Sequence, residues 1–136
     1  RLLKDERVAW LGPLKDVRSA YALFDTFLFP SHREGFGNVL LEAASMQVPV
    51  VAYRVTGCRD AVAEGISGLL VEPKDASALA DAALDLLQDE ALIAQLKANS
   101  RAWAVNHFER GAHQERLFEH YLNWAEAARK NLTPVE

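Results

Sequence analysis

Two glutamates in the stretch 32–53 stand where a carboxylate can bind a ligand. Glu34 precedes a Gly-Phe-Gly loop (35–37), and Glu42 follows eight residues later in a run that is otherwise almost entirely apolar. An ionised carboxylate among apolar neighbours costs several kcal/mol unless it has a partner or opens to water. A carboxylate is also a bidentate hydrogen-bond acceptor for hydroxyl groups. The pair therefore predicts a site for a ligand that carries hydroxyls.

Each glutamate also has an ordinary structural interpretation. Glu42 would then form a buried ion pair or accept a hydrogen bond from the backbone. Glu34 would be an acidic residue that complements the dipole at the start of a helix. Taken residue by residue, the sequence leaves both interpretations open.

The glutamates lie within an alternation of strands and helices. Apolar runs without polar alternation are typical of strands covered on both faces of a parallel sheet. Such runs occur at 8–11, 26–29, 48–53 and, more weakly, 68–71. Between them we expect helices at 17–24, 38–46 and 59–64. This order predicts an α/β fold, a Rossmann-like open parallel sheet with helices on both faces.

From residue 75 onward the apolar residues recur at helical spacing. We expect one helix starting near a cap at Asp75 or Ser77, a second at 90–106 and a third at 110–130. The third has one apolar face, made of Leu117, Phe118, Tyr121, Leu122, Trp124 and Ala128. The simpler expectation is that this face packs onto the chain's own sheet, and the alternative is that it docks onto another domain. Residues 131–136 are expected to be a frayed tail.

The Gly-Phe-Gly loop falls between a predicted strand and a predicted helix. This places it at the carboxyl edge of a parallel sheet, where open α/β folds bind ligands. Gly35 and Gly37 lack a Cβ, so the backbone can turn sharply and approach a ligand closely. The free N–H groups and partial positive charge at a helix start favour phosphate or another anion.

Composition limits the class of protein. A chain of 136 residues with 50% apolar residues can form one domain with a real core. A net charge of −4 argues against a nucleic-acid partner, since there is no broad basic field. A single cysteine favours a reducing compartment, the cytoplasm, and no apolar run is long enough to span a bilayer. The start at Arg1 favours a fragment of a longer protein.

Other reactive residue types do not form a site in the sequence. Cys58 has no neighbouring base, which favours a structural thiol over a nucleophile. The four histidines lack partners at metal-ligand spacing, so no metal is expected. Arg33 is interpreted as an exposed surface charge.

The segment from Phe27 to Asp75 resembles the C-terminal half of retaining glycosyltransferases of family 4, which have the GT-B fold. In that family a Pro-Ser strand end leads into a glutamate, a Gly-Phe-Gly loop and a second glutamate after seven intervening residues. Glu34 and Glu42 match this spacing, and the resemblance extends from about Val8 to Tyr121.

The resemblance implies a role for each matching residue. Glu34 would be the catalytic residue and contact hydroxyls of the donor sugar. Glu42 would accept hydrogen bonds from the ribose of the nucleotide, and the loop near 11–12 would lie beside the base. Helix dipoles and cations would stabilise the departing nucleoside diphosphate without a metal or cofactor. The donor-binding backbone N–H groups would be those of Gly35, Phe36, Gly37, Asn38 and Val39.

The resemblance also implies a function for the whole protein. Residues 1–130 would be the partial nucleotide-sugar-binding domain of a transferase acting on a glycan or lipid-linked acceptor. The loop "VTGCRD" (55–60) is similar to loops in bacterial enzymes of capsule or lipopolysaccharide synthesis, although Thr56 stands where many have proline. The acceptor-binding N-terminal domain and the Arg and Lys that bind the diphosphate would lie upstream. The chain alone is therefore expected to be inactive.

Several alternatives stay open at this stage. A sugar-nucleotide epimerase shares the GT-B architecture but usually lacks this glutamate spacing. A nonenzymatic module that binds nucleotide or docks a partner needs no catalytic half. The whole enzyme would be cytoplasmic, and its peripheral association with the inner face of the membrane is left open.

Overall fold

Three short parallel strands form the sheet that organises the chain. They are β1 (Phe27–Phe29), β2 (Val50–Tyr53) and β3 (Gly68–Val71), in the spatial order β1-β2-β3. The computed structural model describes residues 5–130. Three predicted strands are thus confirmed, with shorter limits for the first two.

The central strand explains why the sequence lacks polar alternation there. All four residues of β2 are buried, and successive side chains enter opposite cores. Val50 and Ala52 belong to one cluster, whereas Val51 and Tyr53 belong to the other. Because the strand is covered on both faces, none of its side chains faces solvent, and every position favours an apolar residue.

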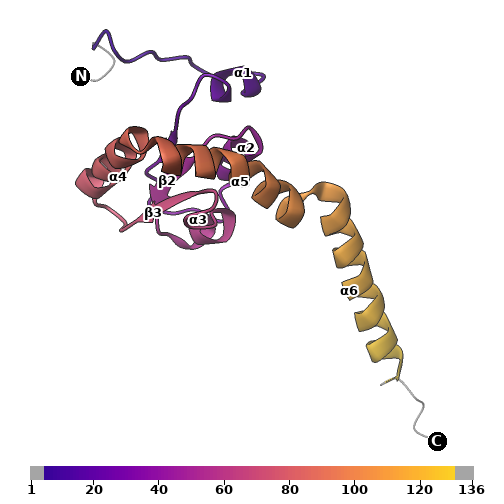
Figure 1. Ribbon diagram of the computed structural model, residues 1–136. Coiled ribbons are helices and arrows are strands. Elements are labelled where there is room, and N and C mark those ends of the chain that lie inside the picture. Colours follow the sequence, from indigo (N-terminus) through magenta and orange to yellow (C-terminus); the bar gives the residue numbers. More distant parts are fainter. Residues whose placement is uncertain (1–4, 131–136) are drawn as a thin grey trace, which may run out of the picture.

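Helices cover both faces of the sheet, as predicted (Figure 1). Helix α2 (Asn38–Ser45) connects β1 to β2, and α3 (Thr56–Ala61) connects β2 to β3. Both pack into the cluster of Val50. Helices α4 (Ala76–Gln88) and α5 (Glu90–Phe108) contribute to the cluster of Val51. The helix predicted at 59–64 was placed three residues too late.

The cap of α4 is Asp75, which settles the choice between Asp75 and Ser77. Its carboxylate accepts a hydrogen bond from the N–H of Ala78 at 2.8 Å. Asp89 caps α5 in the same way, accepting from the N–H of Leu92 at 2.9 Å. Each cap satisfies a backbone donor that a helix start leaves free.

The predicted strand at 8–11 is wrong. These residues form no strand, and Trp10 and Leu11 are 77% and 57% exposed. A strand requires a neighbour to accept its backbone hydrogen bonds, and no strand pairs with this segment in the part of the chain that the structure describes. The apolar run therefore lies extended beside the domain (Figure 1).

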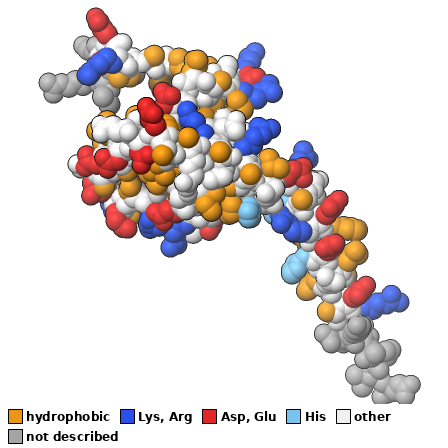
Figure 2. Space-filling model, in the orientation of Figure 1, with side chains coloured by type: hydrophobic (Ala, Val, Ile, Leu, Met, Phe, Trp, Pro, Cys, Tyr) orange, Lys and Arg blue, Asp and Glu red, His pale blue; other side chains and the backbone are white. Residues whose placement is uncertain are grey.

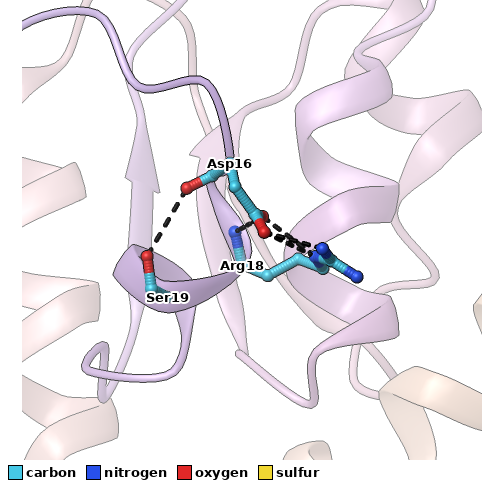
Figure 3. A network of polar contacts seen from close by, with 3 residues as sticks. All are labelled: Asp16, Arg18 and Ser19. Carbon is cyan, nitrogen blue, oxygen red and sulfur yellow. Dashed lines mark hydrogen bonds and ion pairs between the residues drawn. The ribbon is translucent and has the colours of Figure 1, made fainter.

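Helix α1 (Arg18–Tyr21) is shorter than the predicted 17–24. Figure 3 shows its start, where the Asp16 carboxylate accepts from the Arg18 N–H at 3.0 Å and from the Arg18 guanidinium. The hydroxyl of Ser19 lies 3.5 Å from the Asp16 carbonyl oxygen. These contacts fix the turn that places Tyr21 in the core, edge-on to two phenylalanine rings.

Helix α6 (Arg110–Lys130) has the predicted limits but not the expected packing. It projects away from the sheet (Figure 1), and side chains on its apolar face are exposed, with Phe118 at 64% and Trp124 at 70% (Figure 2). The expectation that this face covers the chain's own sheet is therefore wrong. The docking alternative stays a prediction. No described helix has both the length and the apolar composition needed to cross a bilayer.

Candidate functional site

A cleft of about 610 Å³ opens at the carboxyl ends of β1 and β2. This is the edge at which open parallel sheets bind ligands. The loop after β1 and the loop after β2 each provide half of its wall. The lining residues are His32, Arg33, Glu34, Gly35, Arg54, Val55, Thr56 and Arg59.

Glu34 is fixed in this cleft through its own backbone. Its carbonyl oxygen accepts a hydrogen bond from the N–H of Gly57 at 3.2 Å, and its carboxylate accepts from the N–H of Gly35 at 3.1 Å. A Cβ added at Gly57 would lie 2.6 Å from that carbonyl oxygen. The start of α3 thus sits directly against the Glu34 loop, and only glycine permits this approach.

The charge of Glu34 also affects the neighbouring thiol. Cys58 is completely buried, and burial, followed by the negative charge of Glu34, raises the pKa of its thiol. A protonated, buried thiol is a poor nucleophile. This placement fits the structural role predicted for Cys58.

The Gly-Phe-Gly loop turns through Gly37, which has a φ of 76° and is the N-cap of α2. This left-handed conformation favours glycine. No side chain caps α2, and within residues 5–130 no protein acceptor bonds the N–H groups of Asn38 and Val39. An added Cβ at Gly35 would meet no heavy atom within 4 Å. Free donors beside open space can bind an anion or a sugar oxygen.

Phe36 links this loop to the end of α5. Its ring lies edge-on to that of Phe108, with centroids 5.4 Å apart, and Phe108 in turn packs on Trp103 at 5.9 Å. Phe36 thus anchors the loop with its side chain, which leaves the backbone of the loop for a ligand.

Glu42 is not buried among its apolar neighbours, contrary to the prediction from the sequence. Helix α2 buries the stripe of Leu40, Ala43 and Ala44, whereas Glu42 projects from the other side and is exposed. No Lys or Arg forms an ion pair with it among the described residues. Its carboxylate is 3.3 Å from the hydroxyl of Tyr21. The buried ion pair considered for Glu42 is absent there, and its carboxylate can still accept from a ligand.

The two glutamates line separate hollows. Glu42 lies beside a smaller depression of about 270 Å³ between α2 and α5, together with Leu41, Ser45, Ala104, Val105, Phe108 and Glu109. Glu34 lies in the cleft at the strand ends. A ligand that contacts both carboxylates must extend from one hollow to the other along the start of α2.

Three arginines of the cleft differ in their partners. Arg54 is held by Glu64, with Nη1 and Oε2 2.8 Å apart, and by the carbonyl of Leu70 at 2.8 Å. Arg33 and Arg59 are exposed and form no ion pair with any described residue. Arg33 was predicted from the sequence to be a surface charge, whereas Arg59 was not predicted as a site residue. The signal for Arg59 was its position just after a second parallel strand, at the same sheet edge as Glu34.

The described residues contain no group of three His, Cys, Asp or Glu side chains able to hold a metal ion. His32 stacks on Tyr53, with centroids 5.5 Å apart, and the Nδ1 of His107 is 2.9 Å from the carbonyl oxygen of Trp103.

Relatives of known sequence bear on the identity of the chain. The profile of the family "Glycosyl transferases group 1" matches residues 1–89. The chain is 38% identical over 107 residues to the capsular polysaccharide biosynthesis glycosyltransferase CapM of Staphylococcus aureus, covering 79% of this chain and 28% of that protein. It is 35% identical over 124 residues to D-inositol 3-phosphate glycosyltransferase of Thermobispora bispora, covering 89% and 28%. The chain thus spans less than a third of the length of these relatives.

Solved structures show the same fold. The crystal structure of Anabaena HepE in complex with UDP and glucose matches with a TM-score of 0.81 and 28% identity, over 88% of this chain and 33% of that one. The C-terminal domain of LpcC, a group 1 family glycosyl transferase from Francisella tularensis, matches with a TM-score of 0.66 and 25% identity, over 76% and 53%. The fold is that of one half of a GT-B enzyme. With the family profile matching residues 1–89 and the fold in agreement, the chain belongs to the group 1 glycosyltransferases.

Proposed function

We propose that the chain is the donor-binding part of a retaining glycosyltransferase that uses a nucleotide diphosphate sugar. The observation that carries this proposal is the placement of Glu34 and Glu42 on one strand–loop–helix unit, with unbonded backbone donors between them. Such an arrangement offers carboxylates to hydroxyl groups at both ends and N–H groups to a diphosphate in the middle. Similar solved structures, those of Anabaena HepE, are complexes with UDP and with UDP-glucose.

Each residue has a role in this proposal. Glu34 is the catalytic residue and accepts hydrogen bonds from donor-sugar hydroxyls in the cleft. The N–H groups of residues 35–39 contact the sugar and the diphosphate. Glu42 accepts from the ribose hydroxyls. The positive end of α2 stabilises the charge that develops on the leaving diphosphate, so the reaction needs neither a metal nor a cofactor.

The whole protein transfers the sugar to a glycan or lipid-linked acceptor in bacterial capsule or lipopolysaccharide assembly. The names of relatives support this setting, since CapM acts in capsular polysaccharide biosynthesis and another relative is an O-antigen chain mannosyltransferase. Residues 1–130 form the partial donor-binding domain, and a separate domain binds the acceptor in the cytoplasm. Because the chain spans less than a third of its relatives, it is inactive by itself.

The test is donor turnover by the whole enzyme, comparing wild type with Glu34→Ala. We expect turnover to fall by at least about a hundredfold, since an interaction made in the transition state is lost. Asp85→Ala is a matched control, because it removes an exposed carboxylate on α4. Equal turnover by wild type and Glu34→Ala would falsify the proposal.

A docking module is the second candidate, and the exposed apolar face of α6 favours it. Calorimetric titration of the chain with uridine, guanosine and adenosine diphosphates separates the two functions. Heat with one diphosphate supports the donor-binding domain. No heat with any of them at millimolar concentration favours docking.

A further inference from the structure

The cleft beside Glu34 has more positively charged than negatively charged lining residues. Its lining residues include three arginines, Arg33, Arg54 and Arg59, and a single acidic residue, Glu34. Arg54 is already paired with Glu64 and bonds the carbonyl of Leu70. This leaves two guanidinium groups without an ion pair among the described residues.

Structural roles do not account for both of these cations. Arg59 lies in the last turn of α3, where a positive charge complements the helix dipole. Arg33 lies on a loop and has no such role. Like charges that line one cleft repel each other, and an anion bound between them relieves this repulsion.

The chemistry of the guanidinium group defines the ligand. Its planar set of N–H donors binds the oxygens of a phosphoryl or carboxylate group in a bidentate manner. Two such groups come from different elements, one from the loop after β1 and one from α3. A neutral sugar hydroxyl does not require two positive charges.

We propose that Arg33 and Arg59 together bind an anionic oxygen group of the substrate, phosphoryl or carboxylate, in the cleft beside Glu34. The identity of that substrate rests on the proposed function, because the group is either the diphosphate of the donor or a carboxylate on a sugar. The binding of the anion itself does not depend on the nucleotide.

The experiment titrates the 136-residue chain with inorganic pyrophosphate and, separately, with glucuronate, followed by amide chemical shifts in low salt. Arg33→Gln and Arg59→Gln each remove one cation, and Arg129→Gln is the matched control on the exposed side of α6. We expect the dissociation constant of the bound anion to rise about tenfold in each cleft variant, from the loss of a charged hydrogen bond. In the control it should change less than about twofold.

The two anions distinguish the two sources. Weaker pyrophosphate binding in the cleft variants assigns the site to the diphosphate, and weaker glucuronate binding assigns it to a sugar carboxylate. If neither anion binds, or if both cleft variants bind as tightly as Arg129→Gln, the proposal is wrong. Thermal unfolding of each variant checks that the fold is intact, and Arg59→Lys, which keeps the charge without the planar donors, should bind with intermediate affinity.

Failure of this inference can be separated from failure of the proposed function. UDP is titrated in parallel with pyrophosphate. If the cleft variants weaken pyrophosphate binding but UDP binds no tighter than pyrophosphate, the anion site stands and nucleotide recognition fails. If UDP binds tightly and equally to all variants, and the cleft variants also bind pyrophosphate and glucuronate as tightly as the control, nucleotide recognition stands and the anion site fails.

Discussion

The hydroxyl of Tyr21 lies 3.3 Å from Oε2 of Glu42, joining α1 to α2. The same hydroxyl is 3.2 Å from the carbonyl oxygen of Val39, so its single proton is shared between two acceptors. Tyr21 is buried, with an exposed fraction of 6%, and its ring packs edge-on to Phe24 and Phe27. Tyr21 thus connects the aromatic core to the carboxylate of Glu42, which we propose binds the ribose hydroxyls.

Tyr21→Phe removes this hydroxyl and keeps the ring. We expect the free energy of unfolding to fall by about 1 kcal/mol, the typical net value of a hydrogen bond. Urea denaturation of Tyr21→Phe, Glu42→Gln and the double variant gives the coupling between the two side chains. If the two single effects simply add, the hydroxyl bonds only Val39 and does not orient Glu42.

The same tyrosine gives a pH dependence at alkaline pH. Burial, followed by the charge of Glu42 and the hydrogen bond to it, raises the pKa of Tyr21 from 10.0 to about 12. The unfolded chain therefore releases this proton at lower pH than the folded chain does. Stability is unaffected below pH 10 and falls by up to about 2 kcal/mol as the pH rises towards 12.

The measurement for this dependence is the urea midpoint between pH 8 and 12. Tyr21→Phe is the control, because it cannot titrate there. A wild-type curve that runs parallel to that of Tyr21→Phe across this range would contradict the raised pKa.

Gly57→Ala should disturb the Glu34 loop. The new Cβ would lie 2.6 Å from the Glu34 carbonyl oxygen and equally close to the backbone of Gly35 and Phe36. Overpacking of this kind costs about 1–3 kcal/mol, because backbone must move. Gly35→Ala is the matched control, since its Cβ meets nothing within 4 Å. If the two variants had equal free energies of unfolding in urea, the loop could move to accept the added methyl group, and the prediction would be wrong.

Trp124→Ser on α6 should leave the unfolding free energy of this chain within about 0.5 kcal/mol of wild type, as for other exposed positions. Trp124 is 70% exposed, whereas Leu96 on α5 is completely buried. Leu96→Ala should cost about 2–5 kcal/mol by the same measurement. A large loss with Trp124→Ser would mean that the apolar face of α6 is covered in solution.

The elements were predictable where local pattern and tertiary packing agree. β2 is buried on both faces, and its unbroken apolar run is visible in the sequence. The cap at Asp75, one of the two considered, and the limits of α6 follow from local chemistry in the same way. The predicted strand at 8–11 failed because pairing depends on a neighbouring strand, which the sequence of the segment does not contain.

The candidate site was predictable in type and only partly in placement. The position of Glu34 at a strand end followed from the strand–loop–helix order. The exposure of Glu42 could not be predicted, because a helix that is apolar nearly all round does not reveal which of its faces is buried. In the structure the buried face consists of Leu40, Ala43 and Ala44. Arg59 was missed because the sequence shows only which residues are neighbours along the chain. Whether an arginine has an ion-pair partner depends on residues that are close in space, which only the structure shows.

The contact between Phe36 and Phe108 connects the Gly-Phe-Gly loop to the protruding helix α6. Phe108 is the last residue of α5 and is separated by Glu109 alone from the start of α6, which extends for 21 residues, or about 30 Å. This aromatic pair joins the near end of α6 to the Gly-Phe-Gly loop. We therefore expect a partner bound along α6 to alter the position of that loop through Phe108 and Phe36.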